Sequence, residues 1–401
     1  MTLAKLSGST SLVCAGLAGL CISASVASDH VIEVASGVVQ ELSVPIDTAD
    51  RVVKTGAGTL VLPAGNSFRG GVLVENGILR ADYQASGLQS THLALDGATY
   101  SAPAYLQVVG GSFTAPVAES GNGTISLNRY AGIVPYDQDL TINFGGDGRK
   151  MTVGENGFTP TDLILNNSTT CKSTLVNPID QNGAENLTIK SGSAPLYIQH
   201  FTNSVNSGEL NFWGGSLVFD AGSFFRTRRV SWRDGTVAFT NATIRMYNDF
   251  KVGCSDGNSG LARVTLVNCD KKTSWGTDHV NGNDGTTFTI DGGTYVNVGG
   301  MRLGEISGKT GTLILTNNVR YTCTDGGGSA GFYLGNGSRV LQAGGLVELN
   351  DQWARLLVAD GVYEMTGGVM TNNAGWMNDF QIGSENNAAL AGAFLMKGGR
   401  V

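Results

Sequence analysis

Short apolar runs of about five residues recur along the chain, and glycine followed by a small or branched residue opens many of them. In Gly58-Thr-Leu-Val-Leu62, the side chains of Thr59 and Val61 face one side of a strand, while Leu60 and Leu62 face the other. Such runs return about every ten to fifteen residues, and none has the 3.6-residue period of an amphipathic helix. The pattern predicts an all-β protein made of short strands.

A larger unit is also repeated: a strand that ends in glycine, a polar turn, and a second strand. Its five copies begin with Met151–Gly154, Phe250–Gly253, Met301–Gly304, Phe332–Gly335 and Phe380–Gly383. A sandwich or barrel of this length would need two or three domains joined by linkers, whereas the Gly/Asn/Thr-rich texture is uniform from about residue 36 onward. We therefore predict a solenoid of stacked parallel coils of about 20–25 residues each, in which aligned asparagines can form ladders.

The composition agrees with this fold class. Glycine accounts for 58 of the 401 residues, and each glycine inside a helix would cost about 1 kcal/mol, which argues against a helical protein. Hydrophobic residues make up 41% of the chain, enough to build a core.

The N-terminus has the features of a Sec-type signal peptide. Lys5 precedes an uncharged apolar stretch from Leu12 to Val26, and Ser25-Val26-Ala27 places small residues at the expected cleavage site. We therefore predict that residues 1–27 are removed on export, and that residues 28–401 form the repeat region of a secreted or cell-surface protein.

The net charge is −7, which does not favour a nucleic-acid partner. One basic cluster, Arg226, Arg228, Arg229 and Arg233, alternates with apolar residues and is interpreted as the solvated face of strands. Cys254 and Cys269 flank neighbouring strand segments and are the preferred pair for a disulfide, with free buried thiols as the alternative.

The segment 52–80 carries a denser motif. It contains a Lys-x-Gly-x-Gly-Thr-Leu strand, an aromatic-Gly-Gly turn and a closing Asn-x-Gly-x-Leu strand. These positions are Lys54, Gly56, Gly58, Thr59, Leu60, Gly70, Gly71, Asn76, Gly77 and Leu79. The segment strongly resembles the passenger-associated repeat of autotransporter proteins.

The resemblance implies a right-handed parallel β-helix that is displayed at, or released from, the surface of a Gram-negative-type cell. It also implies that the ten motif residues are structural rather than catalytic. Autotransporters end in an outer-membrane barrel of alternating strands of about ten residues, and the sequence predicts no such barrel at its C-terminal end. An outer-membrane translocator is therefore an expected partner, beside a glycan or a surface protein.

Catalytic motifs are weak. Gly327-Gly-Ser329-Ala-Gly331 has nucleophile-elbow spacing, but no histidine follows His279 to complete a triad. Asp278-His279 is interpreted as part of a polar loop, and Asn/Asp-Gly pairs are interpreted as turns rather than metal sites. We expect no cofactor and a non-enzymatic protein for structural display or adhesion.

The alternative is a β-helix polysaccharide lyase or glycoside hydrolase. A cluster of charged residues on one exposed face, lined by Trp213, Trp232 or Trp275, would favour that alternative.

Overall fold

The computed structural model describes residues 29–99, 101–114, 125–143, 152–153, 161–166, 170–171, 173–175, 186–191, 194–202, 209–253, 260–324, 331–350, 354–373, 380–383 and 392–401. The predicted signal peptide, residues 1–27, lies outside this part of the chain. Within it, strands dominate, and the helical content is one short 3-10 turn, η1 (Leu88–Ser90). Successive coils pair through parallel strands, so the prediction of an all-β parallel solenoid is confirmed.

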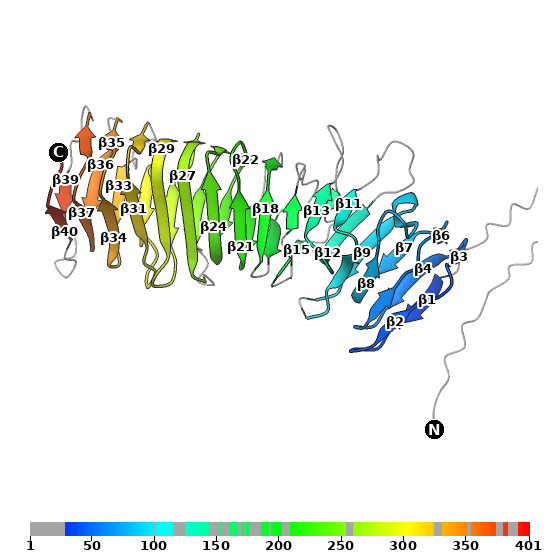
Figure 1. Cartoon of the computed structure of the whole chain (residues 1–401). Coiled ribbons are helices and arrows are strands. Elements are labelled where there is room, and N and C mark those ends of the chain that lie inside the picture. Colours follow the sequence, from blue (N-terminus) through cyan, green and yellow to red (C-terminus); the bar gives the residue numbers. More distant parts are fainter. Residues whose placement is uncertain are drawn as a thin grey trace, which may run out of the picture.

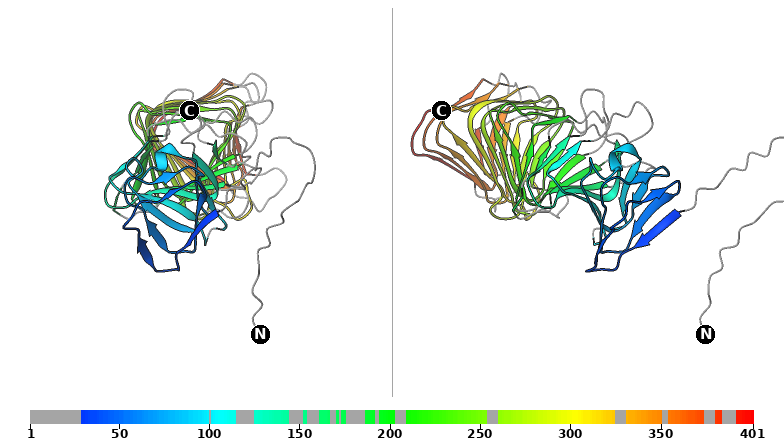
Figure 2. Two further views of the ribbon diagram at one scale, coloured as in Figure 1. Left: turned by 90° about the vertical axis from the view of Figure 1, so that its right-hand side faces the viewer. Right: turned by 45° about the vertical axis from the view of Figure 1, so that its right-hand side comes forward.

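The coils follow one another along a rod, from the N-terminal strands to the C-terminal strands (Figure 1). Each coil contributes strands to three faces in turn, and turned views show these strands wrapped around a common interior (Figure 2).

Face 1 is the longest column of paired strands. It consists of β2 (Val39–Glu41), β5 (Thr59–Val61), β8 (Gly77–Ala81), β10 (Ala104–Val108), the second half of β12 (Ile125–Pro135), β15 (Thr161–Asn166), β17 (Asn186–Ser191), β20 (Glu209–Trp213), β23 (Val230–Trp232), β26 (Phe250–Gly253), β28 (Asp278–Asn281), β30 (Met301–Leu303), β33 (Gly331–Leu334), β36 (Arg355–Val358) and β39 (Phe380–Ile382).

Face 2 follows face 1 in each coil. It consists of β11 (Ser112–Thr114), β13 (Leu140–Asn143), β16 (Ser173–Leu175), β18 (Pro195–Ile198), β21 (Ser216–Phe219), β24 (Gly235–Thr240), the first halves of β27 (Ala262–Thr273) and β29 (Thr287–Asn297), β31 (Thr312–Thr316), β34 (Ser338–Gln342), β37 (Gly361–Met365) and β40 (Ala393–Met396). In the first coils its place in chain order is taken by β3 (Asp47–Thr48) and β6 (Ser67–Phe68).

Face 3 closes each coil and has two separate runs. The first run is β1 (Asp29–Glu33), β4 (Arg51–Thr55), β7 (Val72–Val74), β9 (Leu93–Gly97), the first half of β12, and β14 (Thr152–Val153). The second run is β19 (His200–Thr202), β22 (Phe224–Thr227), β25 (Thr243–Met246), the second halves of β27 and β29, β32 (Arg320–Cys323), β35 (Leu346–Leu349) and β38 (Val369–Asn372).

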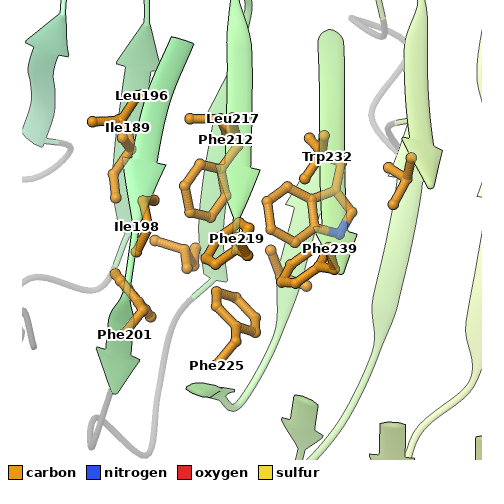
Figure 3. Packing of buried hydrophobic residues seen from close by; sticks show 14 of the residues in the cluster. Ile189, Leu196, Ile198, Phe201, Phe212, Leu217, Phe219, Phe225, Trp232 and Phe239 are labelled. Atoms are coloured by element: carbon orange, nitrogen blue, oxygen red, sulfur yellow. The ribbon is translucent and has the colours of Figure 1, made fainter. Parts of the chain in front are cut away.

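The core is a column of stacked side chains inside the coils, because alternate residues of strands such as β27 and β29 point inward. Phe219 and Phe239 are register partners on neighbouring coils, and their rings stack with centroids 4.0 Å apart. Phe212 and Trp232 repeat this arrangement at 4.5 Å, within the aromatic cluster of Figure 3. Such a ring pair adds about 0.5–1.5 kcal/mol to the gain from burial.

The corners of the coil differ in regularity. The corner between faces 2 and 3 stays short at residues 241–242, 317–319, 343–345 and 366–368, and Asn241, Asn268 and Asn317 adopt positive φ there. The corner between faces 1 and 2 varies from residues 304–311 to residues 335–337. The number of residues in a coil therefore varies. Val230 lies directly beside Phe250, 20 residues later, whereas Met301 lies beside Phe332, 31 residues later.

The two-strand unit found in the sequence is only partly a structural unit. Its first strand is a face 1 strand in four copies, β26, β30, β33 and β39, whereas the copy at Met151–Gly154 contains β14 of face 3. In the copy at Phe332–Gly335, the second strand chosen from the sequence is β35 of face 3. The face 2 strand of that coil is β34 (Ser338–Gln342), which is opened by Gly337.

Candidate functional site

Lys54 of the 52–80 motif is buried where two coils meet. Its Nζ donates hydrogen bonds to the carbonyl oxygens of Gly56, at 2.5 Å, and Asn76, at 2.7 Å. Burial lowers the pKa of Lys54 to about 8. Because the two carbonyl groups belong to successive coils, the Lys54 amine joins the end of β4 to the end of β7.

The motif glycines lie where no side chain has room. A Cβ on Gly77, whose φ is 75°, would lie 2.6 Å from the backbone oxygens of Gly56 and Gly58. Gly56, Gly58 and Gly70 face the backbone of the preceding coil in the same way, and Gly71 also has positive φ. Leu60, Leu79 and Thr59 are buried. The motif positions therefore contact other coils and do not line the cleft described below.

Asn66 is a structural residue that the sequence analysis did not assign. Its Oδ1 accepts a hydrogen bond from the Ile46 amide at 2.8 Å, and its Nδ2 donates to the carbonyl oxygens of Pro63 and Ser86. Ile46, Asn66 and Ser86 are each 20 residues apart, so one side chain bridges three coils. This 20-residue spacing, close to the length of a coil, was the signal in the sequence that could have identified Asn66 as a residue that bridges coils.

The other residues predicted from the sequence to matter for function, which are cysteines, the elbow-like motif and tryptophans, lie in separate parts of the chain. Cys269 is buried and Cys254 lies outside the described residues, so the disulfide stays a prediction. Residues 327–330 of the elbow-like motif also lie outside them. Trp232 is buried in the core and cannot line a ligand site, whereas Trp275 is exposed. The side chain of Trp213 is not among those described.

Asp278-His279 is not a loop but lies on β28, which corrects the sequence interpretation. Asp278 points into the core, where its Oδ1 and Oδ2 accept hydrogen bonds from Lys271 Nζ at 2.8 and 2.7 Å. Lys271 also donates to Thr273 Oγ1 and lies 5.0 Å from the centre of the Phe250 ring. This buried pair fixes β28 from the inside, so His279 points outward.

His279 opens onto a cleft of about 330 Å³ on face 1. Two neighbouring strands, β26 and β28, form its floor, and residues just before β26 and just after β30 complete it. The lining residues are Asp249, Lys251, Val252, Gly253, His279, Asn281, Glu305 and Ile306. A volume of this size is in the range of small-molecule sites.

Lys251, His279 and Arg302 form a row on face 1, because they are register partners on successive coils, and Lys251 and His279 of this row line the cleft. Carboxylates balance this row: Lys251 lies 3.5 Å from Glu209, and Arg302 donates to Glu305. The cleft thus presents both charges and amide groups to a ligand, rather than one dominant charge.

Glu305 and His279 form a pair at the cleft wall. Nδ1 of His279 lies 3.2 Å from Oε2 of Glu305, and the Glu305 amide donates to Oδ1 of buried Asn281 at 2.8 Å. The His279 hydrogen bond, together with Arg302, lowers the pKa of Glu305 to about 2 despite partial burial. An ionised Glu305 orients the imidazole and turns Nε2 away from the pair.

Two further features of the described residues concern metal binding and membrane crossing. No three or more His, Cys, Asp or Glu side chains gather there in a way that could hold a metal ion. The same part of the chain contains no helix of the length and apolarity that crossing a membrane requires.

The coil contact at Gly77 is testable against a glycine in open space. Gly65 has a similar φ of 78°, but a Cβ there would meet no atom within 4 Å. We expect Gly77→Ala to destabilise the chain by about 1–3 kcal/mol more than Gly65→Ala, because only Gly77 adds a steric clash to backbone strain. Urea unfolding followed by far-UV circular dichroism measures both variants. Equal losses would show that the contact is unimportant.

The Glu305 pKa predicts a dependence of stability on pH. A carboxyl group whose folded-state pKa is lowered stabilises the fold above its unfolded pKa, and this contribution is lost as pH falls from about 4.5 to about 2. Glu305→Gln should therefore be less stable than the unmodified chain at pH 7, with the difference shrinking toward pH 2. Unfolding at a series of pH values measures this, with exposed Glu41→Gln as the control. A difference that did not vary with pH would contradict the assignment.

Comparison with known proteins gives one family match. The family model of the passenger-associated-transport-repeat matches residues 52–81, as the resemblance of the motif predicted. No curated protein and no solved structure gives a significant match to the chain. The matched repeat and the parallel β-solenoid together fit an autotransporter passenger β-helix protein.

Proposed function

We propose that the chain is an exported, non-enzymatic passenger-like rod that works in structural display or adhesion. Residues 1–27 would direct export, an outer-membrane translocator would carry the chain outward, and the mature rod would be secreted or held at the cell surface. The family match at residues 52–81 supports this proposal, because the repeat is characteristic of passengers.

The face 1 cleft is the observation that carries an adhesive role. Its lysine and histidine can donate hydrogen bonds, and Asp249 and Glu305 can accept them from pairs of hydroxyl groups. Ile306 adds an apolar side chain. Clustered hydroxyl groups on a compact, partly apolar ring are the chemistry of a saccharide, so we propose a glycan unit as the ligand.

Binding to a glycan array by residues 28–401 tests this role. We expect selective binding that His279→Ala weakens at least tenfold, because the imidazole faces the cleft. Gln381→Ala is the matched control, since Gln381 lies on the same row of face 1 but outside the cleft. Absence of binding, or equal effects of the two variants, would overturn the assignment.

A polysaccharide lyase or glycoside hydrolase is the second candidate. The specific observation in its favour is the Glu305–His279 pair beside Lys251, because an oriented imidazole is suited to proton transfer. The same glycans, incubated in solution with the protein, separate the two functions. Release of reducing ends or unsaturated products that His279→Ala abolishes would replace adhesion by catalysis.

Export is tested by replacing residues 1–27 with a single methionine in a Gram-negative host. We expect the unmodified chain outside the cytoplasm and shortened by 27 residues, and the truncated chain in the cytoplasm. Mass spectrometry of fractionated cells gives both the location and the mature N-terminus. Cytoplasmic retention of the unmodified chain would contradict the export proposal.

A further inference from the structure

A row of positive charge lies on face 3, away from the floor of the cleft. Arg226 on β22, Arg245 on β25 and Lys272 on β27 are register partners on three successive coils. Neighbouring parallel strands are about 4.8 Å apart, so the row spans about 10 Å along the rod. Thr202 and Val296 occupy the next register positions, which makes the row a bounded site.

This arrangement is unfavourable for the fold alone, because like charges directly opposite on neighbouring strands repel. Elsewhere the chain pairs opposite charges, as where Asp29 and Arg51 are register partners joined at 2.8 Å. Within the described part of the chain, Arg245 is the one member of the row with a carboxylate partner, Asp270 at 2.5 Å. Among the described residues, Arg226 and Lys272 form no ion pair.

The corner beside the row adds a fourth cation and two exposed aromatic rings. Arg228 follows β22, and its Nε is buried without a hydrogen-bond partner. The Tyr247 amide donates to the Thr227 carbonyl, and the Trp275 amide donates to the Tyr247 carbonyl, so these corner residues also lie on successive coils. Tyr247 is 53% exposed and Trp275 is 72% exposed.

We propose that this basic ridge, defined as Arg226, Arg228, Arg245 and Lys272 with Tyr247 and Trp275, binds a sulfated polysaccharide. Guanidinium groups bind sulfate in a forked geometry, and cations at regular intervals match anionic groups repeated along a linear chain. The two aromatic rings provide flat apolar surfaces for sugar rings. The glycan lies along the rod axis across three coils.

The ligand class rests in part on the proposed function, since an exported rod meets acidic glycans outside the cell. A basic patch bounded within three coils suits a short stretch of glycan better than an extended duplex.

The experiment measures the affinity of residues 28–401 for heparin, with unsulfated hyaluronan and single-stranded DNA as the comparison probes. We expect heparin to bind at least tenfold more tightly than either comparison probe. Affinity should fall steeply when NaCl is raised from about 50 to about 200 mM, as for other ligands held by several ion pairs. DNA binding as tight as heparin binding would overturn the proposal in favour of a general polyanion surface.

Variants locate the site. The triple variant Arg226→Gln, Arg245→Gln, Lys272→Gln should lose at least tenfold in heparin affinity, and Trp275→Ala should weaken heparin binding without changing its salt dependence. Arg69→Gln, Arg263→Gln, Arg355→Gln is the matched control, because it removes the same charge from exposed positions outside the ridge. Equal losses in the two triple variants, or no effect of Trp275→Ala, would overturn the proposal.

Loss of heparin binding at the basic ridge can be distinguished from loss of glycan binding in the face 1 cleft. The ridge triple variant should leave binding of the glycan in the face 1 cleft unchanged, and His279→Ala should leave heparin binding unchanged. Far-UV circular dichroism verifies that each variant retains the fold.

Discussion

The stacking of one coil on the next is the constraint from which the other features follow. Parallel strand pairing places each residue directly over its counterpart in the preceding coil, at a spacing of about 4.8 Å. Side chains therefore form columns: aromatic rings inside, as at Phe219 and Phe239, and charged groups outside, as at Lys251 and His279. The same close approach leaves no room for a Cβ at Gly77 or Gly253. The stacked core, the glycine-rich corners and the rows of side chains at the cleft therefore all depend on the spacing of about 4.8 Å between successive coils.

Much of the fold was predictable because it depends on local signals. Glycine at strand openings, alternation at Thr59 and Leu60, and the motif around Lys54 each identify a strand or a corner from nearby residues. The parallel solenoid followed from their repetition, and the family match at residues 52–81 agrees with the motif. The assignment of strands to faces was less successful, because Gly337 and Gly345 both open a strand and local sequence does not show which strand lies on face 2.

The cleft was not predictable, because irregular coil lengths hide which residues share a column. Asp249, His279 and Glu305 come from three coils, and their sequence spacing changes with the length of each corner. The Asp278-His279 pair shows the same limit: its polar character suggested a loop, whereas Lys271 neutralises Asp278 inside the core. The basic ridge also required the structure, because Arg245 and Lys272 lie far in sequence from Arg226.

The unequal corners have an evolutionary consequence. The corner between faces 2 and 3 is held short by residues such as Asn241 and Asn317 with positive φ, whereas the corner between faces 1 and 2 tolerates segments as different as 304–311 and 335–337. Insertions and deletions can therefore accumulate beside face 1 without shifting the register of any strand. Recognition can diversify at one edge of the rod while the opposite edge preserves the scaffold.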